Sequence, residues 1–146
     1  MRIYLAARYR RLAEMRRSAD DLERLGHQVT SRWLRGHHDV PGPLGDPAWP
    51  SIAQQDMDDV RAADTLIAFT EPQRGEGGGG RHVELGMGLA WGKRLLVVGP
   101  REHLFHTLPS IEVFPTWTDA LQALSSEGER LGADGTLRKG LPNAPE

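Results

Sequence analysis

The sequence contains no cysteine, so the chain can form neither a disulfide nor a thiolate nucleophile. It also lacks a long apolar run: the segment from Ile3 to Ala7 is far too short for a membrane span or a signal peptide, and arginines follow it. The formal net charge of -2 provides no overall field that would attract nucleic acid. These absences predict a cytoplasmic protein that binds neither nucleic acid nor membrane and acts on a small molecule.

The 146 residues fit one domain with a single core. Short apolar segments, typical of strands, alternate along the chain with segments whose apolar residues recur at helical spacing. Strands are expected at Arg2–Ala6, Val29–Trp33, Thr65–Thr70, Leu95–Val98 and Ile111–Phe114. Four helices are expected: the first ends at Gly26, the second is capped by Ser51, the third runs from about Arg81 to Trp91, and the fourth starts at Thr118 or Asp119. This alternation predicts an α/β, three-layer Rossmann/flavodoxin-like fold with a mainly parallel five-stranded sheet over residues 1–126. Residues 127–146, rich in glycine, proline and charge, are expected to form a flexible tail.

Residues 55–100 place two carboxylates beside a glycine-rich loop. Asp56 lies on the helix before a buried strand, and Glu84 is expected in the first turn of the helix after it. In a parallel sheet both positions reach the crevice at the carboxyl ends of the strands, where ligands bind. The helix dipole and the free N–H groups of a first turn favour an ionised Glu84, as a nucleophile requires. A glutamate that only complements the dipole is the plainer alternative.

Asp56 is distinguished from its acidic neighbours by its position directly before the buried Met57, from which it can flank the core. The nearby aspartates that we expect to be solvated are Asp58, Asp59 and Asp64. The glycines from Gly77 to Gly80 remove side chains from a turn that approaches a phosphate, a sugar or another backbone, or that is simply flexible.

Tyr4 lies inside the first expected strand, where a tyrosine is either a core residue or a ligand contact. Ala6, Ala7 and Arg8 form the next turn, in which backbone amides and one cation can meet an anion. His103 and His106 follow the fourth strand and are expected to line the site or a subunit interface.

Two adjacent histidines, His37 and His38, precede Asp39 in a loop rich in proline. This loop lacks a third ligand at the spacing that a zinc site requires, so the sequence predicts no metal and no cofactor. The arginines at positions 10, 11, 16 and 17 are followed by acids on the same expected helix, which indicates a solvated face.

In this pattern the chain resembles the nucleoside 2-deoxyribosyltransferase-like family, which includes the 2'-deoxynucleoside 5'-monophosphate N-glycosidases and related cytidylate hydrolases. The resemblance runs from Met1 to about Leu124. It rests on Arg2-Ile3-Tyr4-Leu5-Ala6, on Asp56-Met57 followed by Ala63-Asp64-Thr65-Leu66-Ile67-Ala68, and on Gly80-Arg81-His82-Val83-Glu84-Leu85-Gly86 running into Gly92-Lys93-Arg94.

In that family the glutamate matching Glu84 attacks the anomeric carbon of the sugar. The aspartate matching Asp56 handles the base and its proton, and the tyrosine matching Tyr4 orients the glutamate. The resemblance therefore implies an N-glycosidase that cleaves the N-glycosidic bond of a (deoxy)nucleoside 5'-monophosphate. It also implies a homodimer or higher homo-oligomer. Trp91, Leu104 and Phe105 are apolar residues that we expect such an interface to bury.

The substrate-binding residues that we expect follow the strands or the glycine-rich loop: Ala6, Ala7, Arg8, Arg32, Trp33, Gly78, Gly79, Gly80, Arg81, His82 and His106. Arg32 and Trp33 are expected to contact the base. Helix-terminal amides, with Arg8, Arg81, His82 or His106, are expected to hold a phosphate. The chain departs from the family in having Gly78 where a serine or aspartate is common, and Ala7 where a phosphate-binding serine is expected.

Three other functions fit parts of the sequence. A base-exchanging nucleoside 2-deoxyribosyltransferase would use the same nucleophile, and a non-catalytic nucleotide sensor would use only the fold. A phosphoribohydrolase of the cytokinin-activating type also has a glycine-rich loop before a helical glutamate. That family has a Gly-Thr pair where Gly80-Arg81 stands here, and it is therefore the poorer match. The base, the sugar and the need for a phosphate stay open.

Overall fold

The computed structural model describes residues 1–36, 45–72 and 79–134, with side chains as far as Glu127. The five strands are β1 (Arg2–Ala6), β2 (Gln28–Val29), β3 (Thr65–Phe69), β4 (Arg94–Val98) and β5 (Ile111–Phe114). The helices are α1 (Leu12–Arg24), α2 (Trp49–Ala62), α3 (Gly80–Ala90) and α4 (Trp117–Asp134), with three short 3-10 helices, η1 (Tyr9–Arg11), η2 (Arg32–Arg35) and η3 (Leu104–Thr107).

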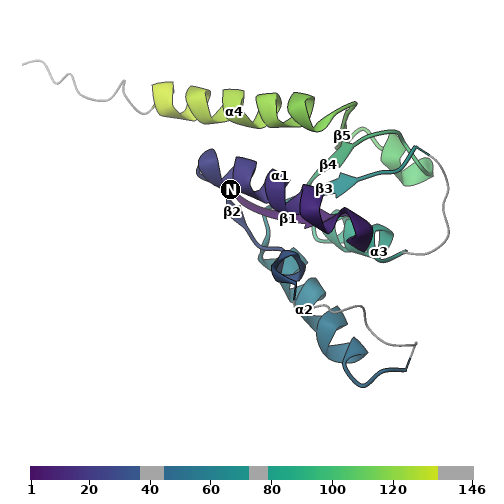
Figure 1. The fold of residues 1–146 in the computed structure, drawn as a ribbon. Coiled ribbons are helices and arrows are strands. Elements are labelled where there is room, and N and C mark those ends of the chain that lie inside the picture. The colour runs from purple at the N-terminus through teal and green to yellow at the C-terminus, as the bar shows by residue number, and fades with distance from the viewer. Residues whose placement is uncertain (37–44, 73–78, 135–146) are drawn as a thin grey trace, which may run out of the picture.

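The strands form one sheet in the order β2-β1-β3-β4-β5, and every neighbouring pair is parallel. Helices α1 and α4 cover one face of the sheet, and α2 and α3 cover the other (Figure 1). The predicted three-layer α/β fold is confirmed. No helix in the described part of the chain is long and apolar enough to cross a membrane.

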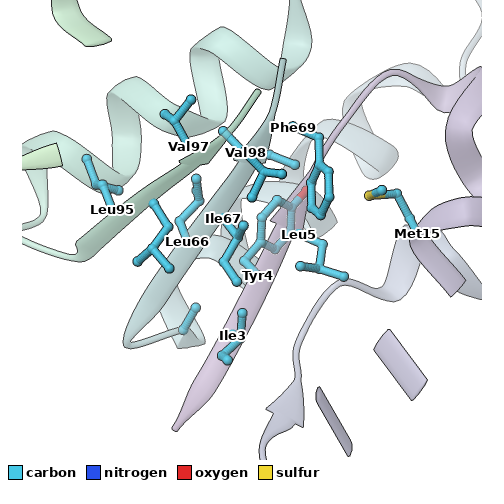
Figure 2. Packing of buried hydrophobic residues seen from close by; sticks show 14 of the residues in the cluster. Ile3, Tyr4, Leu5, Met15, Leu66, Ile67, Phe69, Leu95, Val97 and Val98 are labelled. Atoms are coloured by element: carbon cyan, nitrogen blue, oxygen red, sulfur yellow. The ribbon is translucent and has the colours of Figure 1, made fainter. Parts of the chain in front are cut away.

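The core lies on both faces of β1, β3 and β4, whose apolar side chains are almost all buried. Successive side chains of a strand point to opposite faces, so Leu5 and Tyr4 enter different layers. In Figure 2, Leu5 and Phe69 lie close to Met15 of α1, whereas the ring of Tyr4 lies on the sheet among other buried residues. This alternation aims the Tyr4 hydroxyl at the layer that contains α3.

The second strand ends at Val29, earlier than the sequence predicts. The next stretch does not continue the ladder because side chains take over the backbone groups of Leu5. The Leu5 N–H donates to Ser31 Oγ at 2.7 Å, and Trp33 Nε1–H donates to the Leu5 carbonyl at 2.9 Å. The chain then turns into η2, so the prediction of a strand through Trp33 is wrong.

Helix α2 begins at Trp49, before the predicted cap Ser51. The Ala48 N–H donates to Asp46 Oδ1 at 2.8 Å, and Pro50 lies in the first turn, where a helix does not use the backbone N–H of that residue. Within this helix Val60 is buried and Ala53 is exposed, and Met57, which was expected to be buried, is only partly so.

Helix α4 is capped by Thr116, whose Oγ1 accepts the Asp119 N–H at 3.2 Å, so the helix starts just before the predicted positions 118 and 119. It continues to Asp134, and the first part of the predicted tail is therefore helical. Arg94 of β4 explains this extension in part, because it makes ion pairs of 2.7 Å with both Glu112 and Glu127. Residues 135–146 lie outside the described residues.

The strand order reverses between β1 and β3, because the chain moves from β1 to one side of the sheet and later returns to β3 on the other. In open α/β sheets the crevice beyond the carboxyl ends of two such strands is the usual ligand site. Ala7 and Arg8 follow β1 there, and Thr70 follows β3.

Candidate active site

The side chains of Tyr4 and Glu84 meet across 80 positions of sequence. The Tyr4 O–H donates to Glu84 Oε1 at 2.8 Å, and Tyr4 is fully buried in β1. Tyr4 is therefore a core residue by its ring, and its hydroxyl binds the carboxyl group that the sequence singled out; a contact of Tyr4 with a ligand stays a prediction.

Glu84 lies deeper in its helix than predicted. Because α3 begins at Gly80, Glu84 is in the second turn rather than the first, and it loses the direct effect of the helix terminus. Burial is the largest influence on the pKa of Glu84 and raises it. The hydrogen bond from Tyr4 lowers this pKa and the charge of Asp56 raises it, so that the pKa is about 8. A pKa of about 8 favours the protonated form of this carboxyl group at neutral pH, in place of the ionised form that was expected from the helix terminus.

Asp56 approaches the same pair from α2. One of its carboxylate oxygens, Oδ1, is buried, and its charge raises the pKa of both Tyr4 and Glu84. Burial is the larger cause of the raised Tyr4 pKa, which keeps the tyrosine a hydrogen-bond donor. Three elements, β1, α2 and α3, therefore bring together the three residues for which the resemblance implies catalytic roles.

The small residues predicted to contact a ligand lie at the end of β1 and at the start of α3, the elements that carry Tyr4 and Glu84. Ala6 ends β1 and is buried, while Ala7 and Arg8 follow it and are partly exposed. Gly79 and Gly80 start α3, and a Cβ added to either one would meet no described atom within 4 Å. Neighbouring atoms among the described residues therefore do not require glycine there. Gly78 lies outside the described residues.

Arg81 and His82 are engaged by Glu102, a residue that the sequence did not single out. Arg81 is only 6% exposed and donates twice to Glu102, at 2.5 and 2.8 Å, while His82 Nε2 lies 3.2 Å from the same carboxylate. Burial alone would raise the pKa of Glu102, but the bonds from Arg81 and from the Glu71 N–H lower it overall. The structure thus makes Arg81 an internal ion-pair partner, which argues against its predicted role with phosphate.

Arg32 and Trp33, the predicted base contacts, have structural partners in this fold. Arg32 binds Asp59 with its backbone N–H at 2.8 Å and its Nε at 2.6 Å. Asp59 is only 5% exposed, so its expected solvation is wrong. Trp33 is buried, and its indole N–H is committed to Leu5.

The two histidines after β4 differ in their surroundings. His106 is 1% exposed and accepts the Glu102 N–H with Nδ1 at 3.1 Å, so it is a buried residue. Burial lowers its pKa to about 4, and the neighbouring histidines and Arg81 act in the same direction. His103 lines a surface groove together with His82 and the apolar residues Leu85, Leu89 and Phe105.

The fold is shared with two solved enzymes. The 2-deoxyribosyltransferase of Bacillus psychrosaccharolyticus aligns with 83% of this chain and 90% of its own, with a TM-score of 0.64 and 22% identity. The CMP N-glycosidase BcmB of Clostridium botulinum aligns with 86% of this chain and 99% of its own, with a TM-score of 0.57 and 23% identity. The sequence matches no protein-family model and no curated protein. The chain therefore has the α/β fold found in nucleoside 2-deoxyribosyltransferase-like enzymes.

Proposed function

We propose that the protein hydrolyses the N-glycosidic bond of a (deoxy)nucleoside 5'-monophosphate, with Glu84 as the nucleophile. The observation that carries this proposal is the trio of Tyr4, Glu84 and Asp56 beside the point where the strand order reverses. Paired carboxyl groups are what glycosidic cleavage needs, one to stabilise and capture the oxocarbenium-like sugar and one to move a proton. The similarity to a CMP N-glycosidase supports the same substrate class.

The proton held by Glu84 is central to the mechanism. An attacking carboxylate has to be ionised, and the leaving base has to receive a proton. Since Asp56 is close enough to raise the Glu84 pKa, moving one proton from Glu84 to Asp56 gives each carboxyl group the form that it needs. Tyr4 favours this step, because its O–H donates to Glu84 and lowers the Glu84 pKa.

Two displacements at the anomeric carbon then complete the reaction. Glu84 forms an ester bond to this carbon as the bond to the base breaks, and the base leaves with the electron pair and takes a proton from Asp56. A water molecule next attacks the same carbon, its proton passes to Asp56, and the ester to Glu84 breaks. The products are the free base and the sugar phosphate.

Arg8 is the cation best placed to face the phosphate. It follows β1 at the reversal point, and its charge contributes to the lowered pKa of His82 near the start of α3. The N-terminus of α3, with its backbone N–H groups, is the second element suited to an anion. In this proposal Arg8 and the N-terminus of α3 bind the phosphate, the role that the sequence predicted for Arg81.

The direct test is the release of free base from a panel of nucleosides and nucleoside 5'-monophosphates, followed by chromatography. Glu84→Gln should abolish turnover while substrate still binds, because the amide cannot form the ester. Glu14→Gln is the matched control, since Glu14 lies on α1 and is paired with Arg11. Full activity of Glu84→Gln would end the covalent mechanism. Substrate binding without base release by the wild type would indicate a sensor.

Asp56→Asn separates proton transfer from positioning. The rate should fall strongly for natural bases and much less for a substrate with a good leaving group, which needs little protonation. An equal loss on both substrates would assign Asp56 to positioning alone.

A base-exchanging transferase is the second candidate, favoured by the similarity to a 2-deoxyribosyltransferase. In that reaction a second base, instead of water, displaces Glu84. Adding a free base to the assay distinguishes the two functions: a hydrolase continues to produce free sugar phosphate, whereas a transferase produces a new nucleoside or nucleotide.

We also propose that the protein works as a homo-oligomer. Leu104 and Phe105 of η3 are 72% and 53% exposed, and Val83 of α3 is 64% exposed. Leu104 and Phe105 line one groove, and exposed large apolar side chains of this kind are typical of an interface. Trp91 is less exposed and lies under Arg61, whose guanidinium carbon is 4.8 Å from the ring centre. Light scattering that shows a fully active monomer would contradict this proposal.

A further inference from the structure

Three histidines from separate positions in the sequence converge where α3 meets η3. His82 belongs to α3, His103 precedes η3, and His106 lies within it. One ring nitrogen from each lies within 4.8 Å of the others. The closest pair is His82 Nδ1 and His103 Nε2, which are 3.2 Å apart.

Two ring nitrogens of this cluster are buried without a hydrogen-bond partner among the described residues: His103 Nδ1 and His106 Nε2. A buried polar atom that has lost its water and gained no partner is unfavourable, and native proteins hold few of them. Of the two, His106 Nε2 is the atom that a metal between the rings would engage, because His103 faces His82 through Nε2. Three imidazoles also cannot satisfy one another fully, since each neutral ring has one donor and one acceptor in fixed directions.

Glu102 prepares His82 for a cation. Its Oε2 is 3.2 Å from His82 Nε2, so in the neutral ring the proton lies on Nε2 and the lone pair of Nδ1 faces His103. A carboxylate that accepts the outer N–H of a histidine is the usual support of a metal-bound imidazole. Arg81 holds this carboxylate in place with two hydrogen bonds.

We propose that His82, His103 and His106 bind one divalent transition-metal ion of the Zn²⁺ class. Neutral imidazoles suit Zn²⁺, Ni²⁺ and Cu²⁺, and they are poor ligands for Mg²⁺ or Ca²⁺. In a tetrahedral zinc site with Zn–N bonds of about 2.0–2.1 Å, ligand nitrogens lie about 3.3 Å apart. The 3.2 Å between His82 Nδ1 and His103 Nε2 matches that separation.

His106 is the ligand that has to adjust. Its Nδ1 accepts the Glu102 N–H, which leaves the proton of the neutral ring on Nε2. A neutral imidazole cannot accept a hydrogen bond at one nitrogen and bind a metal at the other, so His106 exchanges this bond for the metal.

The metal site is separate from the proposed catalytic trio. His82 and Glu84 are two positions apart on α3, which places them about 200° apart around the helix. Three protein ligands leave a fourth position for water or another ligand, and the groove lined by His82 and His103 opens beside them. A bound ion would also fix η3 to α3.

The test is metal binding by the full chain purified without a histidine tag and treated with a chelator. Zn²⁺ is titrated against a chromophoric chelator, and Co²⁺ is added separately because its visible absorption reports the coordination number. We expect one ion for each chain and the spectrum of four-coordinate Co²⁺. His103→Gln and His82→Gln should each weaken binding of the ion at least about a hundredfold. This expectation is by analogy with the 10–100-fold effect of losing a residue that supports a metal ligand.

Two controls remove histidines from other positions. The first control, His27→Gln, replaces a histidine whose Nδ1 lies beside the N-terminal amine of Met1. The second, the double variant His37→Gln/His38→Gln, removes the two adjacent histidines. Both should bind as the wild type does. His82 is 36% exposed, so its variant should fold even if another does not, and circular dichroism checks this. No stoichiometric binding, loss of binding in the double variant, or unchanged affinity in folded His82→Gln would each overturn the proposal.

Discussion

Replacing Glu84 by glutamine should stabilise the protein at alkaline pH, because the structure buries a carboxyl group that would otherwise ionise. The pKa of Glu84 is raised from 4.5 to about 8, mainly by burial. Between these values the folded protein holds a proton that the unfolded chain has released. The free energy of unfolding therefore falls as the pH rises through this window.

The size of the effect follows from the two pKa values. At about 1.4 kcal/mol for each pKa unit, the wild type should lose about 4 kcal/mol of stability between pH 5 and pH 9 through this group alone. Glutamine cannot ionise, and its side-chain carbonyl can still accept the Tyr4 O–H. The loss should therefore be absent from Glu84→Gln.

Urea unfolding followed by the fluorescence of the four tryptophans measures this difference. The wild type and Glu84→Gln are compared at several values between pH 5 and pH 9, so that all other titrating groups cancel. Glu14→Gln is the control: its bond from Arg11 lowers the Glu14 pKa, and that stability is lost only in acid. A wild-type-to-variant difference that changes by less than 1 kcal/mol over this range would refute the argument that burial protonates Glu84.

The remaining predictions concern the rate and the support of the site. Because the proposed reaction needs one proton on the pair of Glu84 and Asp56, kcat/KM for natural bases should be level up to about pH 8 and fall tenfold for each pH unit above it, and a rate that keeps rising beyond pH 8 would contradict this. Tyr4→Phe removes the bond to Glu84; it should slow base release about ten- to a hundredfold and shift the alkaline limb to higher pH. Asp59→Asn should lower the free energy of urea unfolding by about 1–3 kcal/mol, because it weakens two hydrogen bonds from Arg32.

The sequence was enough to predict the layered fold and the residues that meet at its switch point. Apolar runs of strand length alternated with helical periodicity, and four of the five strands lie within one residue of their predicted bounds. Tyr4 and Glu84 were singled out although 80 positions separate them, and their hydrogen bond agrees with the role that the resemblance implied. Whether they catalyse a reaction stays a prediction.

The protonation of Glu84 could not be predicted from the sequence. It depends on how deeply the carboxyl group is buried and on its approach to Asp56, which are properties of three packed elements. The same holds for Arg81, which looked available for phosphate until Glu102, 21 positions later, was found to bind it. A sequence pattern assigns residues to faces but does not pair charges between separate loops.

The shortness of β2 has a consequence for the behaviour of the protein at high concentration. An edge strand with free N–H and C=O groups is a template on which another chain can add a strand and aggregate. Here the ladder is only two residues long, and beyond it Ser31 and Trp33 occupy the N–H and the carbonyl of Leu5. An incoming strand would have to displace both side chains, one of them a buried indole. Ser31 and Trp33, whose side chains end the second strand earlier than predicted, thus also protect this edge of the sheet against self-association.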